Sequence, residues 1–238
     1  MTLNRERAVD PLILFVHGAN HDGWCWAPVL ERLDRVGVAG RAIDLPFTSF
    51  EDDTAAVREA VREIARARPV VLVAHSYGGL PVTAGGQGAD RFVFVAARMP
   101  PAGESPAAHT PRWSHPEFRA AWDTGEDGAV ILRGEAREVL YSHSPPNMAE
   151  LAAQRWRPMA SRVPRTPIIE PAWMSAPSVY VVCTKDRTVR VGAQRECAAH
   201  ATESIEIDCD HSPFFSAPDR LAALLAEQAE HAARTVRT

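Results

Sequence analysis

The chain of 238 residues is long enough to form one α/β domain with a substantial buried core. Hydrophobic residues make up 46% of it and charged residues 24%, a composition typical of globular proteins. Its formal net charge of −4 offers no electrostatic attraction to nucleic acid or to an anionic membrane, so we expect neither as a partner.

Strands and helices alternate in the first part of the chain. Residues 12–16 form a continuous apolar run, which is typical of a strand buried on both faces of a parallel sheet. Asp52 and Asp53 are expected to cap a helix. The apolar positions of this helix recur at helical spacing, at Val57, Ala60, Val61 and Ile64. Two further buried strands are predicted at residues 70–74 and 91–96.

The same alternation returns toward the C-terminus. We predict a buried strand at residues 178–183, a helix at 191–199, an edge strand at 204–208 and a last helix from Pro218. The apolar positions of the last helix are Leu221, Leu224 and Leu225. This order predicts an α/β fold with a doubly wound, mostly parallel sheet.

Residues 98–177 interrupt the alternation. They hold twelve of the 19 prolines and four of the 6 tryptophans, and they contain no clear strand. A segment of this size is too long for a plain connection. We interpret it as a small, partly helical cap, inserted after the third predicted strand, over the edge of the sheet where ligands bind in such folds. One structural unit is expected, with a core of residues 1–97 and 178–238 and a cap of residues 98–177.

A serine follows the second buried strand directly, in the segment "VVLVAHSYGGL". A strand, a serine and a helix-compatible stretch are typical of a nucleophile elbow, a strained turn that exposes the serine hydroxyl at the edge of the sheet. Small residues are needed two positions before and after the serine, and here these are Ala74 and Gly78. Ala74 stands where the pattern prefers glycine. Ser76 is therefore a candidate nucleophile, and an ordinary helix cap is the alternative.

A glycine loop follows the first strand in "FVHGANHDGWCW". Gly18 lets this loop lie close to a substrate, and we expect the backbone N–H groups of Ala19 and Tyr77 to form an oxyanion hole. His17 more often shapes such a loop through hydrogen bonds than transfers protons. His21 is expected to be partly exposed in the wall of a pocket. The glycine between the two histidines argues against a metal pair.

An acid and a base follow later strands. Asp186 lies in the loop after "VYVVC" and His211 in the loop after "SIEID". The resulting order of Ser76, Asp186 and His211 is that of a hydrolytic triad on an α/β sheet. In this interpretation His211 is the general base, and Asp186 holds its tautomer. Asp210 remains a minor alternative acid.

These motifs together resemble the α/β-hydrolase superfamily. Within it, the chain is similar to the branch of plant methylesterases, hydroxynitrile lyases and related small bacterial esterases. The resemblance rests on "VHGANHDGWCWAPV", "VLVAHSYGG", "YVVCTKDRTV" and "DHSPFFSAPDRLA", which span nearly the whole chain. It implies an α/β-hydrolase fold, activity on small esters, a Ser-His-Asp triad and no cofactor. The leading hypothesis is a serine carboxylesterase that acts on a small, largely apolar ester, thioester or lactone through an acyl-enzyme on Ser76.

Hydroxynitrile lyases are the first alternative that the resemblance raises. They typically carry a threonine at the position of Gly18 and a lysine directly after the catalytic histidine, where this chain has Ser212. Both features are missing, so ester hydrolysis is favoured. A tailoring enzyme of secondary metabolism that transfers an acyl group or cleaves a C–C bond would use the same triad, and a ligand-binding receptor would not need it.

The substrate pocket and the setting of the enzyme are less constrained. The pocket candidates are Gly18, Asn20, His21, Tyr141, Trp156 and Trp173, each of which has an ordinary packing role as its alternative. We expect a small-molecule substrate, with no metal and no membrane span, and a homodimer remains open.

The cysteines indicate where the protein works. Their positions, Cys25, Cys183, Cys197 and Cys209, form no CxxC pair. They are typical of buried thiols in a reducing compartment, and the N-terminus does not resemble a secretory signal. The cytoplasm is therefore the expected location.

Overall fold

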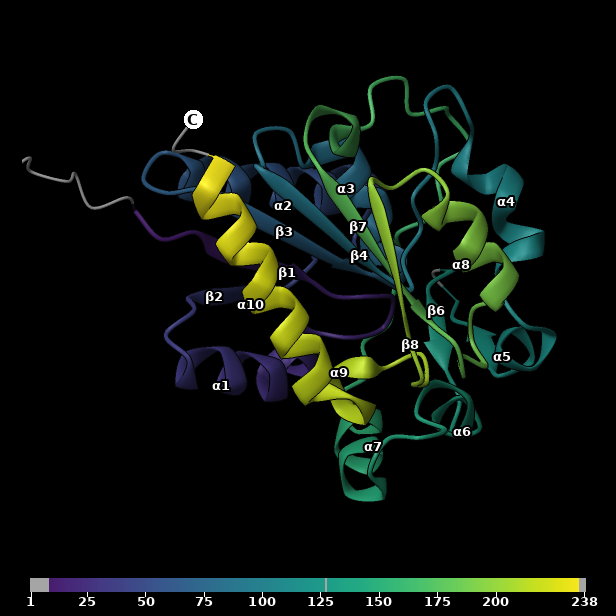
Figure 1. Ribbon diagram of the computed structural model, residues 1–238. Coiled ribbons are helices and arrows are strands. Elements are labelled where there is room, and N and C mark those ends of the chain that lie inside the picture. Colours follow the sequence, from purple (N-terminus) through teal and green to yellow (C-terminus); the bar gives the residue numbers. More distant parts are fainter. Residues whose placement is uncertain (1–8, 127, 236–238) are drawn as a thin grey trace, which may run out of the picture.

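The structure is a computed structural model that describes residues 9–126 and 128–235, apart from the side chains of residues 109 and 235. The first eight residues of the expected core thus lie outside the described residues. A six-stranded, fully parallel sheet runs through the centre of the molecule in the order β2-β1-β3-β4-β7-β8 (Figure 1). The strands are β1 (Leu12–Val16), β2 (Gly40–Ile43), β3 (Val70–His75), β4 (Arg91–Val95), β7 (Ser178–Cys183) and β8 (Glu203–Ile207).

Strand β3 lies in the middle of the sheet, and all six of its residues are buried. It pairs with β1 on one side and with β4 on the other, in registers that place Ala74 beside Val16 and Phe94. Continuous β-branched and apolar residues suit such a strand because both of its faces are covered by helices. The end of β3 is therefore a rigid base for the residues that follow it.

Two helical layers cover the sheet (Figure 1). On one face, α1 (Ala27–Arg35) and α10 (Pro218–Thr235) pack with the strand residues Phe15 and Val73 in one apolar cluster. On the other face, α2 (Phe50–Ala65), α3 (Gly79–Gly85) and α8 (Val191–Ala198) pack with Val16 and Leu72. Successive strand residues thus point into opposite layers, as the period of a strand requires.

The segment between β4 and β7 is partly helical and contains two short strands. Its helices are α4 (Pro106–Trp113), α5 (Pro116–Ala120), α6 (Ala136–Leu140), α7 (Pro146–Ala153) and the 3₁₀-helix η3 (Ala172–Ser175). The prediction that the segment holds no clear strand is wrong, because β5 (Trp122–Thr124) and β6 (Val130–Leu132) form an antiparallel pair. Each of these strands has three residues, too few to show an alternating pattern.

The start of α2 also differs from the prediction. The helix begins at Phe50, and its cap is Ser49, whose hydroxyl accepts the backbone N–H of Asp52. Asp52 lies in the first turn, where a carboxylate suits the positive end of the helix dipole. Asp53 is buried and accepts hydrogen bonds from the backbone N–H of Phe47 and from the hydroxyl of Tyr77.

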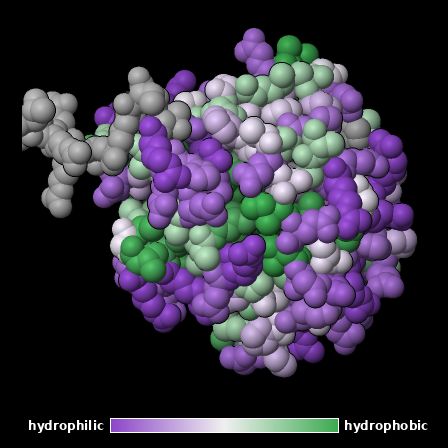
Figure 2. All heavy atoms as spheres, in the orientation of Figure 1, coloured by the Kyte–Doolittle hydropathy of each residue, from purple (hydrophilic) through white to green (hydrophobic). Residues whose placement is uncertain are grey.

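The other predicted elements end within one residue of their expected bounds. Helix α1 and strand β2 are additional elements that the pattern of the sequence did not reveal. The face of the molecule seen in Figure 2 is mostly hydrophilic, with apolar residues in small patches. Within the described ranges, no helix has the length and apolar character that a membrane crossing needs.

Candidate active site

Ser76 stands at a sharp turn between β3 and the 3₁₀-helix η2 (Ser76–Gly78), which continues into α3. Its φ of 51° lies in the left-handed region, which costs a non-glycine residue roughly 1–2 kcal/mol. The turn is tight, because a Cβ on Gly78 would lie 2.5 Å from the carbonyl oxygen of His17. Ala74 is fully buried inside β3, so the sheet accommodates alanine where the motif prefers glycine.

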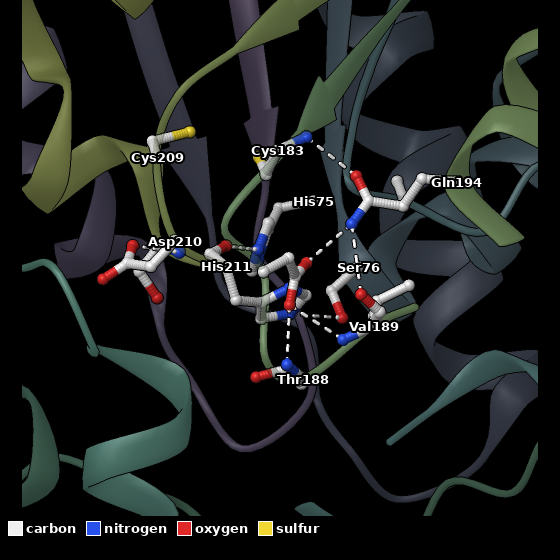
Figure 3. Close-up of polar contacts among 12 residues, drawn as sticks. His75, Ser76, Cys183, Thr188, Val189, Gln194, Cys209, Asp210 and His211 are labelled. Carbon is white, nitrogen blue, oxygen red and sulfur yellow. Dashed lines mark hydrogen bonds and ion pairs between the residues drawn. The ribbon is translucent and has the colours of Figure 1, made fainter. Parts of the chain in front are cut away.

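The His211 ring faces Ser76 (Figure 3). Asp186 contacts the other nitrogen of the same ring. His211 Nε2 lies 3.1 Å from Ser76 Oγ, and His211 Nδ1 lies 2.7 Å from Asp186 Oδ2. A carboxylate only accepts, so Nδ1 donates its proton to Asp186 and Nε2 is left to accept the serine proton. His211 and Asp186 are buried whereas Ser76 is partly exposed, so the hydroxyl is the part of this group that a substrate can reach.

The carboxylate of Asp186 is held on both of its oxygens. Oδ1 accepts the backbone N–H groups of Thr188 at 2.7 Å and Val189 at 2.8 Å, and Oδ2 accepts the side-chain amide of Gln194 at 2.8 Å. Gln194 is buried in α8, and its amide oxygen accepts the backbone N–H of Cys183 at the end of β7. Its side chain therefore ties the acid to the strand that carries it. Sequence reasoning missed Gln194, because a glutamine on a helix matches no catalytic motif.

Asp210 lies next to His211 in the sequence, but its carboxylate bonds to other groups than the imidazole. Its Oδ1 accepts the backbone N–H of Ser212 and the hydroxyl of Ser216, at the start and end of α9 (Pro213–Ser216). Its Oδ2 accepts the backbone N–H of His143 and the hydroxyl of Ser144. Asp210 thus joins the loop of His211 to the segment after α6, and the carboxylate at the imidazole belongs to Asp186.

His75 contacts the loop that carries His211. Its ring lies 4.6 Å from that of His211 between centroids, and its Nε2–H donates to the backbone carbonyl of His211 at 2.8 Å. Burial lowers the pKa of His75 well below its usual value, so the ring is neutral. Figure 3 shows His75 beside the main chain of His211, where its hydrogen bond holds the loop in place.

The loop after β1 is shaped by a buried, neutral histidine. His17 Nε2 accepts the backbone N–H of Leu45 at 2.9 Å, so Nδ1 carries the proton and donates to the carbonyl of Gly18. Burial lowers the pKa of His17 to about 4. A Cβ on Gly18 would lie 2.9 Å from Ser76 Cβ, which places the loop directly against the serine. The oxyanion donors expected on this loop and at Tyr77 stay a prediction.

Three of the expected pocket residues form one hydrogen-bonded chain. Trp156 Nε1–H donates to Tyr141 Oη at 2.9 Å, and the Tyr141 hydroxyl donates to His21 Nε2 at 2.8 Å. His21 Nδ1–H then donates to the carbonyl of Ala19 at 2.7 Å. His21 is buried rather than partly exposed, because the rings of Tyr141 and Phe214 pack against it. Burial lowers its pKa to about 4.

Besides Gly18, the pocket candidates outside this hydrogen-bonded chain are Asn20 and Trp173, which bond to different segments. Asn20 donates its side-chain amide to the carbonyls of Val130 and Arg157, which fastens the loop after β1 to the segment between β4 and β7. Trp173 donates to the carbonyl of Pro100 at 3.3 Å, and its ring lies 6.3 Å from that of His200. It packs with the helices on the α3 face of the sheet. A pocket role for Trp173 stays a prediction.

This arrangement can form and cleave a covalent intermediate. A serine oxygen, an imidazole that can take its proton and a fixed carboxylate are the three groups that such chemistry needs. The described residues contain no group of three or more side chains arranged to hold a metal ion.

Comparisons with known proteins agree with this geometry. The model of the Alpha/beta hydrolase family matches residues 13–224. Methylesterase 3 of Arabidopsis thaliana is 28% identical over 251 residues, covering 90% of this chain and 94% of the relative. The alpha/beta hydrolase nvfD of Aspergillus novofumigatus is 26% identical over 249 residues, covering 94% and 98%. The crystal structure of the methylesterase MES16 from Arabidopsis superposes with a TM-score of 0.74 at 23% identity, covering 92% of this chain and 99% of the other, which shows a shared fold.

Proposed function

The chain belongs to the alpha/beta hydrolase family, and from this premise we propose that it is a serine esterase whose nucleophile is Ser76. The family match confirms the resemblance and the fold class expected from the sequence. The observation that carries the proposal is the alignment of Ser76 Oγ, the His211 ring and Asp186, at 3.1 Å and 2.7 Å.

The reaction has two steps. In the first, Ser76 Oγ attacks the carbonyl carbon of the ester while His211 Nε2 takes the hydroxyl proton. The resulting imidazolium delivers this proton to the departing alkoxide, and the acyl group remains on the serine. In the second step, His211 removes a proton from water, the hydroxide attacks the acyl carbon, and the acid leaves as Ser76 recovers its proton. Asp186 stabilises the imidazolium in both steps.

The negative oxygen of the tetrahedral intermediate needs donors that are already in place. We propose the backbone N–H groups of Ala19 and Tyr77 for this role. The support is the close approach of Gly18 to Ser76, together with the hydrogen bonds that hold the loop through His17 and His21.

The substrate is proposed to be a small, largely apolar ester, thioester or lactone. The polar atoms of His21, Tyr141 and Trp156 are engaged with one another and with the Ala19 carbonyl, so these rings present apolar faces. The relative named Methylesterase 3 agrees with a small alkyl ester.

Gly18 and Ser212 further favour hydrolysis over cyanohydrin cleavage. A side chain at position 18 would collide with His75 and Ser76, since a Cβ there would lie 2.7 Å from His75 Nδ1. No cation directly follows His211, because residue 212 is a serine, and its side chain is fully buried. The features expected of a hydroxynitrile lyase are therefore missing from this site.

The test is turnover of p-nitrophenyl acetate and butyrate and of methyl esters by the purified protein. We expect Ser76→Ala to abolish turnover and to prevent labelling by a fluorophosphonate. Ser212→Ala is the matched control, because its hydroxyl is buried without a partner among the described residues and cannot reach a substrate. Equal activity of wild type and Ser76→Ala would disprove the proposal, and a wild type that neither turns over nor is labelled would favour a ligand receptor.

We also propose that the enzyme works in the cytoplasm. The support is that all four cysteines are free thiols in the structure. Fractionation of the native host with an antibody against the protein would test this, and recovery in a secreted fraction would contradict it.

A further inference from the structure

A cavity separate from Ser76 opens between α4, α8 and the residues that follow β4. It contains about 610 Å³ of space, part of which is open to solvent. Arg98, Met99, Leu80, Trp113 and Cys197 are among the residues that line it, whereas Ser76, His211 and Asp186 are not. Helices α4 and α8 lie on the same side of the molecule in Figure 1. The cavity therefore lies beside the catalytic group and is distinct from it.

The inner wall of the cavity carries a buried positive charge. Arg98 is only 8% exposed, and burial lowers the pKa of its guanidinium to about 10, so it remains a cation at neutral pH. Its charge lies over the ring of Trp113, with Cζ 5.2 Å from the ring centroid. Within the described part of the chain, Arg98 makes no ion pair with a carboxylate. A buried cation without a counter-ion is costly, so the site favours an anion that would enter it.

The guanidinium also has hydrogen-bonding capacity to spare. Nη1 makes two long bonds of 3.2 Å, to the carbonyl of Pro106 and the hydroxyl of Thr110. Nε and Nη2 make no hydrogen bond to any described residue. Both atoms keep some solvent-accessible surface, because neither belongs to the fully buried atoms that lack a partner. These two N–H groups form one edge of the fork that binds a carboxylate through two parallel bonds.

The surroundings of Arg98 suit an apolar body on that carboxylate. Trp113 keeps 6% of its surface exposed, and Pro101 and Ala193 are half-buried in the lining, so these residues offer aromatic and aliphatic surface. Other ionisable side chains of the lining, which include Glu104, Arg112 and Glu196, are exposed at the rim. Water screens these rim groups far more than the buried guanidinium, so the inner cation dominates the choice of ligand.

We propose that this cavity binds a small amphiphilic carboxylate, whose carboxylate pairs with the free edge of Arg98 and whose apolar part packs on Trp113, Pro101 and Ala193. The ligand lies behind the nucleophile turn, because the backbone N–H of Arg98 donates to the carbonyl of Ser76 at 3.0 Å. The proposal does not depend on the chemistry at Ser76, since none of the triad side chains takes part.

The experiment compares 4-phenylbutyrate with 4-phenyl-1-butanol, which has the same apolar body and no charge, by isothermal titration calorimetry. Wild type should bind one equivalent of the carboxylate, and the alcohol at least about 10-fold more weakly, because charge-assisted hydrogen bonds are the stronger ones. Arg98→Met should weaken carboxylate binding by about 10-fold or more. The control Arg112→Met removes a cation at the exposed rim and should change the dissociation constant less than about 3-fold.

A second variant keeps the test decisive if Arg98→Met does not fold. Ala193 lines the cavity from the half-exposed side of α8, so Ala193→Trp should fill the space and weaken binding without removing Arg98. Equal affinity for the alcohol would overturn the proposal, as would absence of carboxylate binding to wild type at millimolar concentration. Binding that is unchanged in both Arg98→Met and Ala193→Trp would place the ligand outside this cavity and would overturn the proposal too.

Discussion

Gln194 donates its side-chain amide to Asp186 Oδ2 over 2.8 Å, at the same oxygen that faces His211 Nδ1. The glutamine also accepts the backbone N–H of Cys183, so one buried side chain fixes the acid relative to its strand. Asp186 is thereby held on both oxygens by groups that do not react, and its orientation toward the imidazole is set before a substrate arrives.

Replacing Gln194 by leucine should therefore affect both stability and catalysis. The change leaves the Cys183 N–H buried without an acceptor, which costs about 1–3 kcal/mol of unfolding free energy. Loss of the donor to Asp186 loosens the acid, and we expect kcat/KM to fall by about 10-fold or more. Urea denaturation and ester hydrolysis measure the two effects. Arg195→Gln, on the exposed side of the same helix, is the control, and equal loss in both variants would contradict a positioning role for Gln194.

Two aspartates near His211 should give opposite results on conversion to asparagine. Asp186→Asn puts an amide at the imidazole and favours the wrong tautomer, so kcat should fall by a factor on the order of 10³–10⁴, as in other serine triads. Asp210→Asn replaces an acceptor of four hydrogen bonds and should instead lower the unfolding free energy by about 1–3 kcal/mol. Comparing kcat with denaturation curves separates the two. A larger loss of kcat from Asp210→Asn would assign the acid to Asp210.

The backbone strain at Ser76 predicts a difference between two inactive variants. Ser76 has a φ of 51°, which alanine would share at a cost and glycine would adopt freely. Glycine relieves the backbone strain but also gives the unfolded chain more conformational entropy, which offsets part of the gain. On balance, Ser76→Gly should have a free energy of unfolding about 1 kcal/mol higher than that of Ser76→Ala. Urea unfolding of both proteins tests this. If Ser76→Ala were the more stable of the two, the turn would carry no strain.

The buried histidines predict that the fold loses stability in mild acid. Burial lowers the pKa of His17 and of His21 from 6.5 to about 4. Between these values the unfolded chain binds the protons that the folded chain rejects, so stability is complete above pH 6.5 and falls as the pH approaches 4. Each histidine should cost about 2 kcal/mol at pH 5 relative to neutral pH.

Urea denaturation at pH 7.5 and pH 5.0 checks this expectation. His17→Gln removes one of the three buried histidines whose pKa is lowered, the others being His21 and His75, and keeps an acceptor for the Leu45 N–H. Its stability should therefore fall less steeply between the two pH values. A fall as steep as that of wild type would mean that His17 does not contribute.

Strong local patterns allowed much of the fold to be predicted from the chain alone. The central strands have unbroken β-branched and apolar runs, because they are buried on both faces, and each was placed within one residue. Strand β2, with the sequence "GRAI", lies at an edge and is partly exposed, so it lacks that signature. The short strands β5 and β6 are also partly exposed, and with three residues each they are too short for that signature.

The residues of the candidate site also fall into those that could be predicted from the sequence and those that could not. Ser76, Asp186 and His211 could be predicted because each follows the end of a strand, where local sequence determines the turn. The bond from Gln194 to Asp186, the bonds from His143 and Ser144 to Asp210, and the chain from Trp156 to His21 could not. Their partners lie between 8 and 120 residues away, and no local pattern specifies such pairings.

By itself, then, the sequence determined the alternation of strands and helices and the family to which the chain belongs, and it placed Ser76, Asp186 and His211 each after a strand, in that order along the chain. Periodicity and turn chemistry are local properties, and they are written in consecutive residues. Only the tertiary structure decided that Asp186 rather than Asp210 faces the imidazole, that His21 is buried beneath Tyr141, and that Arg98 lines a cavity behind Ser76. Those results depend on how distant segments pack, because burial and hydrogen-bond partners arise only when the whole chain has folded.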